Sequence, residues 1–432
     1  MASSRDASET SGGTPPRVAV VGAGISGLTA ASHLARGGCA VTVYETGRGP
    51  GGRTSTRRAG PDGAGWQFDH GAQYFSAKDP AFRAIVEDWH ADGLVAEWTG
   101  TFGALDAATG TFVPEETQTK ERWVGTPSMN AVAKGLARRS GISLVTSRRV
   151  TSFEGGPGVG DGSWTVVHRS SAPSARTDAN GDPVPEPPRR DARFVAVVAA
   201  DKQAASDRSV RVYGEDPPIA SAAAPAVREG MRASGQTPSF ALMLAVKKKT
   251  GAGDVPLFEF QGATVEGDDV VAWIADDSSK PGRPTGAPDA DVTCWVAQST
   301  PGYAARRVKA MATVPGTAPH QALLNEVAEE MTEALLGLAA KCAGRGAGEA
   351  EKRVEYEIAH VAAHRWGAAF PDDGAVAAAA ASGKGCLLDA ERRVVGCGDF
   401  CVSPKVEGAA LSGAAAAARV AELIAETPAA SL

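Results

Sequence analysis

Residues 17–45 read RVAVVGAGISGLTAASHLARGGCAVTVYE and decide the fold. The stretch starts with an apolar run typical of a buried strand, passes through a glycine-rich turn and continues with apolar residues at helical spacing. A second β-type run ends at Glu45. The order strand, turn, helix, strand predicts a βαβ unit. We therefore expect an α/β protein whose main domain is a doubly wound, Rossmann-like parallel sheet.

The glycine turn has the spacing G-x-G-x-x-G directly between a predicted strand and a predicted helix, which is the context that dinucleotide binding requires. Gly24 would let a pyrophosphate approach the backbone, and Gly27 would let the helix pack closely on the strand. Glu45, at the end of the second strand, would accept hydrogen bonds from the ribose hydroxyls of an adenosine. The residues predicted to bind the nucleotide here are Gly22, Gly24, Ile25, Ser26, Gly27 and Glu45.

Residues 48–54, RGPGGRT, form a second glycine-rich loop with fixed positive charge, suited to the far side of a long flavin dinucleotide. This loop favours FAD over NAD. It resembles the R-x-x-G-G-R-x-x-T/S motif of the flavin-containing amine oxidase superfamily, with Arg48, Arg53 and Thr56 at the polar positions. The resemblance implies that Arg53 contacts the FAD pyrophosphate. The residues predicted to bind FAD here are Gly51, Gly52, Arg53 and Thr54.

The C-terminal part also resembles this superfamily, which ends its FAD domain with a G-D element followed by E-G-A-x-x-S-G. Here these elements are residues 396–400 and 407–413. The resemblance implies that Asp399 binds the ribityl chain or phosphate. Backbone N–H groups after Glu407, around Gly408 and Ala409, would point at flavin N1 and O2, where a helix N-terminus stabilises negative charge. Val150 is a further predicted FAD contact.

Within the superfamily, the chain most resembles renalase and its plant and bacterial relatives. The segments that carry this likeness are FDHGAQYF (68–75), WVAQ (295–298) and HRWGAA (364–369). The likeness spans about residues 17–425 and names Gln73, Gln298 and Trp366 as catalytic candidates facing the flavin. Relatives often carry His where Gln298 stands. Trp366 either closes the flavin pocket or packs the domain interface.

The resemblance implies an FAD-dependent oxidoreductase in which a small donor of the dihydronicotinamide type gives hydride to flavin N5 and O₂ or another acceptor reoxidises the flavin. FAD would be bound non-covalently, because neither Cys397 nor Cys401 sits in the family's flavin-linking motif. Four alternatives remain open at this point. They are an amine oxidase, a polyene desaturase or isomerase, a flavin monooxygenase, and a non-catalytic FAD-binding scaffold.

We predict a discontinuous FAD domain from residues 16–74, 141–204 and 365–427, and a discontinuous α+β substrate domain from residues 75–140 and 205–364. Apolar runs between residues 239 and 300 predict an antiparallel sheet in the second domain. Residues 320–342 and 408–426 are expected to be helices. Residues 1–15 are expected to be a disordered tail, and residues 170–193, rich in Pro, Ser and charge, a mobile insertion.

Composition excludes several other classes of protein. The chain has 432 residues and a net charge of −6, which disfavours a nucleic-acid partner. Its six cysteines form no C-x-x-C pair, so we expect neither a disulfide framework nor a zinc ribbon. We expect the protein to lie in the reducing cytoplasm, with a plastid as the alternative location. His360 and His364 have the spacing of a zinc helix but lack its glutamate, so no metal is predicted. We expect a small-molecule substrate and no membrane span.

Overall fold

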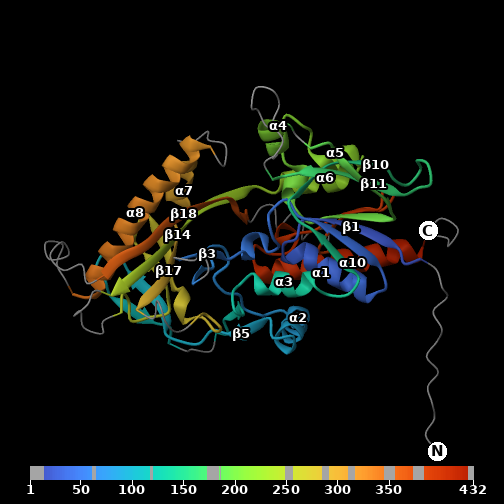
Figure 1. Cartoon of the computed structure of the whole chain (residues 1–432). Coiled ribbons are helices and arrows are strands. Elements are labelled where there is room, and N and C mark those ends of the chain that lie inside the picture. Colours follow the sequence, from blue (N-terminus) through green and yellow to red (C-terminus); the bar gives the residue numbers. More distant parts are fainter. Residues whose placement is uncertain are drawn as a thin grey trace, which may run out of the picture.

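The computed structural model describes residues 14–60, 65–116, 120–172, 184, 186–248, 256–284, 291–309, 317–344, 356–372 and 384–426. The chain forms two halves, each built around a β-sheet, that lie side by side (Figure 1). One half holds both chain ends of the described part, and the other carries the long helix α8. The predicted division into a nucleotide-type domain and a second sheet domain is therefore visible in the architecture.

The first half is the predicted Rossmann-like domain. Its six-stranded sheet has the order β19-β20-β13-β1-β2-β9, parallel except for the edge strand β19. Alternate residues of β1 face opposite sides, so Val18 and Val20 pack with the helices while Ala19 and Val21 pack in a second core. The strands are β1 (Arg17–Val21), β2 (Ala40–Tyr44), β9 (Ile142–Val145), β13 (Ala196–Ala199), β19 (Leu387–Asp389) and β20 (Val394–Gly396).

Helices cover one face of this sheet, and a smaller sheet covers the other. Helix α1 (Ile25–Arg36) lies beside α10 (Val406–Ala425), and α3 (Ala131–Ala137) contacts α1 (Figure 1). On the opposite face lies the three-stranded antiparallel sheet of β10 (Arg148–Gly155), β11 (Trp164–Ser170) and β12 (Arg189–Phe194). Strands β10 and β11 pair antiparallel, and the predicted α/β class with a Rossmann-like parallel sheet is confirmed, with a β-sheet instead of helices on its second face.

The second half is built on a seven-stranded sheet of order β18-β14-β17-β16-β15-β6-β7, antiparallel except where β15 pairs with β6. Helix α8 (Ala318–Cys342) packs Val327, Met331 and Leu335 on one face of this sheet. The strands are β6 (Phe102–Asp106), β7 (Phe112–Pro114), β14 (Gln236–Lys248), β15 (Gly262–Glu266), β16 (Val271–Asp276), β17 (Val292–Ser299) and β18 (Tyr356–Pro371). The predicted antiparallel sheet and helix are therefore present.

Short elements connect the two halves. The hairpin of β3 (Arg57–Ala59) and β4 (Trp66–Phe68) packs on the seven-stranded sheet, on the face opposite helix α8. The remaining elements are η1 (Gly52–Thr54), α2 (Pro80–Ala91), β5 (Val95–Glu97), β8 (Trp123–Gly125), η2 (Lys202–Ala205), α4 (Arg208–Tyr213), α5 (Pro218–Ser221), α6 (Pro225–Ala233), η3 (Asp277–Ser279), α7 (Pro301–Lys309) and η4 (Asp399–Cys401).

The structure moves several of the predicted domain boundaries. Residues 365–371 belong to β18 and pair with β14, so they are part of the second sheet. Phe82 and Trp89 of α2 pack in the core of the first half, although residues 75–140 were assigned to the second. Val227 and Met231 of α6 do the same. Apolar periodicity shows which face of a helix is buried but not which sheet it covers, and this explains the difference.

The predicted insertion at residues 170–193 needs a correction at its C-terminal end. Residues 189–193 lie in β12 and pair with β11, because His168 and Val167 face Arg189 and Arg190 in register. The side chains of this strand are mostly exposed and charged, so the sequence shows no apolar alternation from which the strand could be predicted. Residues 173–183 and 185 of that segment lie outside the described residues, as do residues 1–13 of the predicted tail.

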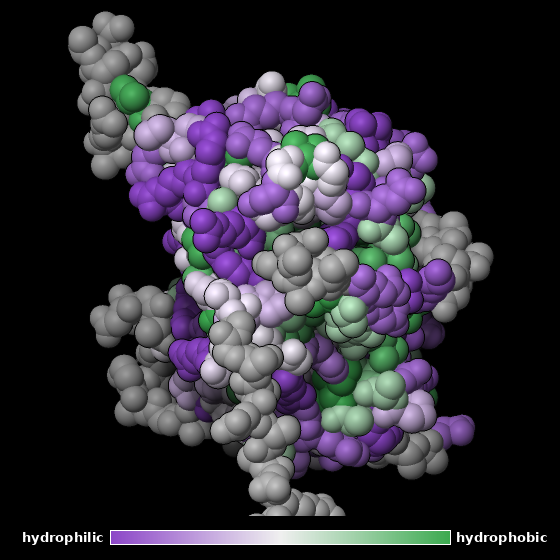
Figure 2. All heavy atoms as spheres, turned by 90° about the vertical axis from the view of Figure 1, so that its right-hand side faces the viewer, coloured by the Kyte–Doolittle hydropathy of each residue, from purple (hydrophilic) through white to green (hydrophobic). Residues whose placement is uncertain are grey.

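Helix α10 is long and apolar enough to cross a membrane by length and composition, which the sequence analysis did not expect. Its small residues pack against α1, where a Cβ on Gly413 would lie 2.2 Å from the Ser26 carbonyl oxygen. The core helix of a folded domain passes the same test of length and composition. The outer face of this half is mainly hydrophilic in its upper part and carries apolar residues lower down (Figure 2).

Candidate active site

A cavity of about 1360 Å³ is lined by residues of both halves and contains most of the predicted site. One end of the cavity, here called the nucleotide end, is formed by Gly22, Glu45 and Asp201. These residues come directly or shortly after the parallel strands β1, β2 and β13, respectively. This is the edge at which doubly wound sheets bind ligands. Among the predicted site residues, all line the cavity except Gly27, Val150 and Gly408.

The glycine turn has one position that packs and one that stays open. A Cβ on Gly27 would lie 2.0 Å from the carbonyl oxygen of Gly22, so this glycine serves the contact between α1 and β1. A Cβ on Gly24 would meet no heavy atom within 4 Å. Gly22 itself has φ +103, a conformation that favours glycine. The open space beside Gly24, at the N-terminus of α1, fits a phosphate group.

Glu45 is fixed beside this turn. Its Oε2 accepts a hydrogen bond of 2.9 Å from the Ala23 N–H, and its Oε1 accepts one of 2.6 Å from the Gly47 N–H. Burial raises the pKa of Glu45, and these two bonds oppose the effect. Each carboxylate oxygen keeps a second lone pair, so Glu45 can still accept from a ribose hydroxyl.

Arg53 and Asp399, predicted as separate FAD contacts, bind each other. Arg53 Nη1 and Nη2 donate to the two carboxylate oxygens of Asp399 at 2.6 Å each, and Nη1 also donates to the Ala369 carbonyl at 3.1 Å. The Arg53 side chain is 42% exposed and that of Asp399 only 6%. The pair therefore leaves part of the guanidinium free to bind a ligand in the cavity.

The start of α10 completes the nucleotide end. Glu407 Oε1 accepts hydrogen bonds of 2.8 Å from the N–H groups of Lys78 and Asp79, which fixes the loop before α2. A Cβ on Gly408 would lie 2.1 Å from the Ser403 carbonyl oxygen, so Gly408 is needed for a close backbone contact and does not line the cavity. Ala409, one residue further on, does line it.

Val150 is the predicted contact that the structure places elsewhere. It lies in β10, is 4% exposed, and packs in the core between the two sheets of the first half. Its side chain does not line the cavity. The alternation of side chains along β10 directs Val150 into that core.

The three predicted catalytic residues converge on the loop of residues 69–71. Gln298 Nε2 donates to the Gly71 carbonyl at 2.6 Å, and Gln73 Nε2 donates to the same carbonyl at 3.2 Å and to the Asp69 carbonyl. Trp366 Nε1 donates to the His70 carbonyl at 2.8 Å. One loop therefore sets the positions of two amides and an indole in the cavity wall.

Trp366 belongs to an aromatic cluster whose histidines the sequence analysis did not assign to the site. His70 stacks on Trp366 with ring centroids 5.2 Å apart, and His364 meets Trp366 edge-on at 4.5 Å. Burial lowers the pKa of His70 to about 4 and that of His364 to about 3, so both rings are neutral at pH 7. His364 could have been assigned to the site from the sequence, because residues two apart on a strand point to the same face and His364 lies two residues before Trp366.

A fully buried ion network supports this wall and was not predicted. Lys280 Nζ lies 2.5 Å from Asp277 Oδ1 and 3.2 Å from Asp69 Oδ2, and it donates to Gln73 Oε1 at 3.4 Å. Arg283 bonds both aspartates. Asp69 and Lys280 are 211 residues apart in sequence, so no local pattern could reveal the pairing. The network joins the end of β4 to the segment after β16.

Comparisons with known proteins agree with this fold. The model of the NAD(P)-binding Rossmann-like domain family matches residues 20–89. A hydroxyneurosporene desaturase of Cereibacter sphaeroides is 54% identical over 52 residues, which are 12% of this chain and 10% of that protein. The chain thus aligns with only about a tenth of the length of this curated relative.

Solved structures match over nearly the whole chain. Putrescine oxidase in complex with putrescine is 15% identical, with 96% of this chain and 100% of that chain covered and a TM-score of 0.55. Cyclohexylamine oxidase from Brevibacterium oxydans IH-35A is also 15% identical, with the same coverage and a TM-score of 0.60. The first half of the protein therefore has a Rossmann-like fold. Over nearly its whole length the chain is similar in fold to putrescine oxidase and cyclohexylamine oxidase.

Proposed function

We propose that this protein is an FAD-dependent oxidoreductase that takes hydride from a small, planar donor of the dihydronicotinamide type, as a renalase-like enzyme would. The observation that carries the proposal is the continuity of the cavity, which runs from the open space at Gly24 to the wall of Gln73, Gln298 and Trp366. Its volume of about 1360 Å³ exceeds the range of about 300–1,000 Å³ that single small ligands occupy. The cavity is therefore large enough to hold a dinucleotide and a substrate at the same time.

The residues present fit FAD. Arg53 and the N-terminus of α1 would hold the pyrophosphate, Glu45 the adenosine ribose, and the backbone near Ala409 the flavin ring. Cys397 and Cys401 are both buried, neither lines the cavity, and burial raises the pKa of both thiols. These positions support non-covalent binding.

When bound, FAD supplies a hydride acceptor at N5 and passes the electrons on to O₂ or another acceptor. The chain's own residues orient the donor and exclude water. A dihydronicotinamide loses hydride from a ring carbon and leaves as a nicotinamide cation, so no proton has to be removed. Neutral His70 and His364 are consistent with this, because the aromatic wall need not act as a base.

The test is flavin reduction without oxygen. The purified protein should be yellow, and its FAD absorbance should bleach rapidly with at least one dihydronicotinamide isomer and slowly with simple amines or a carotenoid. Rapid bleaching by an amine or a polyene alone would assign the protein to the amine oxidase or desaturase class. A protein that neither contains FAD nor takes it up would refute the proposal.

A further inference from the structure

Three arginines line the other end of the cavity, here called the substrate end. Arg208 and Arg211 come from α4, which lies above the junction of the two halves, and Arg365 comes from β18 (Figure 1). No carboxylate is among the residues that line this end within the described part of the chain. The four acidic residues that do line the cavity, Glu45, Asp201, Asp399 and Glu407, lie at its nucleotide end.

Each of those four carboxylates already accepts at least one hydrogen bond from the protein. Glu45 and Glu407 accept hydrogen bonds from backbone N–H groups, and Asp399 holds Arg53. Asp201 accepts a hydrogen bond of 2.9 Å from the Gln203 N–H. Among the described lining residues, a cationic amine would therefore find no carboxylate beside Arg365 and Trp366.

The charge of Arg208 acts on Arg365 and also on the buried carboxylate of Asp201, which shares the cavity wall. In the described ranges neither guanidinium makes an ion pair or donates a hydrogen bond, and Arg365 Nε is buried with no partner. Burial lowers the pKa of Arg365, and so does the nearby charge of Arg208. Two like charges at one cavity wall repel each other, so an anion bound between them would be attracted by both.

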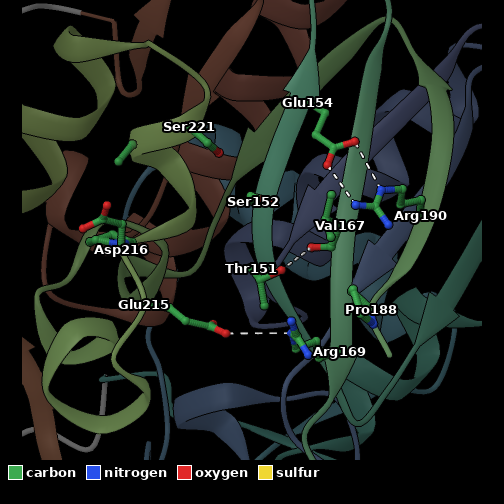
Figure 3. A pocket seen from close by; sticks show the side chains of 12 residues that line it. Thr151, Ser152, Glu154, Val167, Arg169, Pro188, Arg190, Glu215, Asp216 and Ser221 are labelled. Atoms are coloured by element: carbon green, nitrogen blue, oxygen red, sulfur yellow. Dashed lines mark hydrogen bonds and ion pairs between the residues drawn. The ribbon is translucent and has the colours of Figure 1, made fainter. Parts of the chain in front are cut away.

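The arginines of a second cleft differ from Arg208 and Arg365, because they form ion pairs. This cleft of about 470 Å³ lies between the outer face of β10–β12 and the loop before α5. There Arg190 lies 3.3 Å from Glu154, and Arg169 lies 3.8 Å from Glu215 (Figure 3). The arginines of this cleft are paired with glutamates of the same cleft, so they give no reason to expect an anionic ligand there.

We infer that Arg208 and Arg365 bind an anionic group of the substrate, a phosphate or a carboxylate, and so make the enzyme selective for anionic hydride donors. This inference rests on the proposed function and specifies its substrate class. A guanidinium presents paired N–H groups that match the oxygens of either group. The phosphate or carboxylate would lie at the substrate end while the oxidisable ring of the same molecule lies against Trp366.

The experiment compares two donors that differ only in charge. Dihydronicotinamide riboside and its 5′-phosphate are used to reduce the FAD-loaded protein under argon in a stopped-flow instrument. The wild type should have at least a tenfold lower apparent dissociation constant for the phosphate. Arg208→Gln and Arg365→Gln should each remove about tenfold of that preference and leave the riboside unchanged. Arg190→Gln, in the second cleft, is the control and should change neither donor.

Equal affinity of the wild type for both donors would overturn the inference while leaving the proposed function standing. Loss of bound FAD in Arg208→Gln and Arg365→Gln would also overturn it, because these arginines would then serve the cofactor. If neither donor reduces the wild type, the proposed donor is wrong. Calorimetric titration with phenyl phosphate, benzoate and benzylamine then decides the inference. It holds if wild type binds either anion and the two variants do not, and it falls if neither anion binds.

Discussion

A methyl group at residue 24 should separate folding from cofactor binding. Gly24 has φ −77 and ψ 179, which alanine adopts without strain, and its added Cβ would meet no protein atom within 4 Å. Gly24→Ala should therefore stabilise the apoprotein by about 0.4–1 kcal/mol through the unfolded chain. The same Cβ would stand in the space assigned to the pyrophosphate. Displacing one charge-assisted hydrogen bond, worth about 1.5–3 kcal/mol, should weaken FAD binding by roughly ten- to hundredfold.

The assay is FAD titration of the apoprotein, followed by flavin fluorescence, together with urea unfolding without FAD. Gly27→Ala is the matched comparison, because its Cβ would lie 2.0 Å from the Gly22 carbonyl oxygen. That overlap should cost the apoprotein about 1–3 kcal/mol or more. Wild-type FAD affinity in a folded Gly24→Ala protein would show that the pyrophosphate does not lie at this turn, and the site would have to be redrawn.

Three further predictions concern charge. Arg53→Ala should weaken FAD binding at least about tenfold in the same titration, since it removes the guanidinium proposed to hold the pyrophosphate by a charged hydrogen bond; unchanged FAD affinity would show that Arg53 serves only to hold Asp399. Lys280→Met leaves Asp69 and Asp277 with one cation fewer and should lower the free energy of unfolding by about 3–5 kcal/mol in urea; an unchanged midpoint would contradict this. Burial raises the pKa of Asp276 from 3.8 to about 6, so the folded state binds more protons than the unfolded state between these values and stability falls as pH rises through them. Asp276→Asn should abolish that fall and stabilise the protein at pH 7 by up to about 3 kcal/mol, with no gain near pH 4.

The sequence predicted those features that local pattern determines. The βαβ unit, the glycine turn and the position of Glu45 follow from 29 consecutive residues, 17–45, and the structure places them as expected. Residues that meet across the fold were harder. Asp399 and Arg53 were each named, but their mutual ion pair joins positions 346 residues apart. The Asp69–Lys280 network was missed for the same reason, because contact between distant segments leaves no periodic signal.

Val150 and the domain boundaries show a second limit of pattern. Val150 was named as an FAD contact, yet its side chain faces the core between two sheets of the first half. Helices α2 and α6 have clear apolar faces, but α2 packs against α10 and α6 against β19 and β20, all in the half to which they were not assigned. Side-chain type predicts burial, while the choice of partner depends on the open surfaces that the rest of the chain provides.

The order of strands in the first sheet also bears on how the protein is made. The central strand β1 is synthesised first, but its sheet is completed by β20 at residues 394–396, and α1 is covered by α10 only after that. Asp399, Glu407 and Ala409 follow β20 in the chain, so they leave the ribosome only after every strand of this sheet. A nascent chain that stops before residue 394 therefore holds an unfinished sheet and an uncovered apolar helix, both prone to aggregate. Cofactor uptake should thus be post-translational, and truncated products should be removed by proteolysis rather than accumulate as partial flavoproteins.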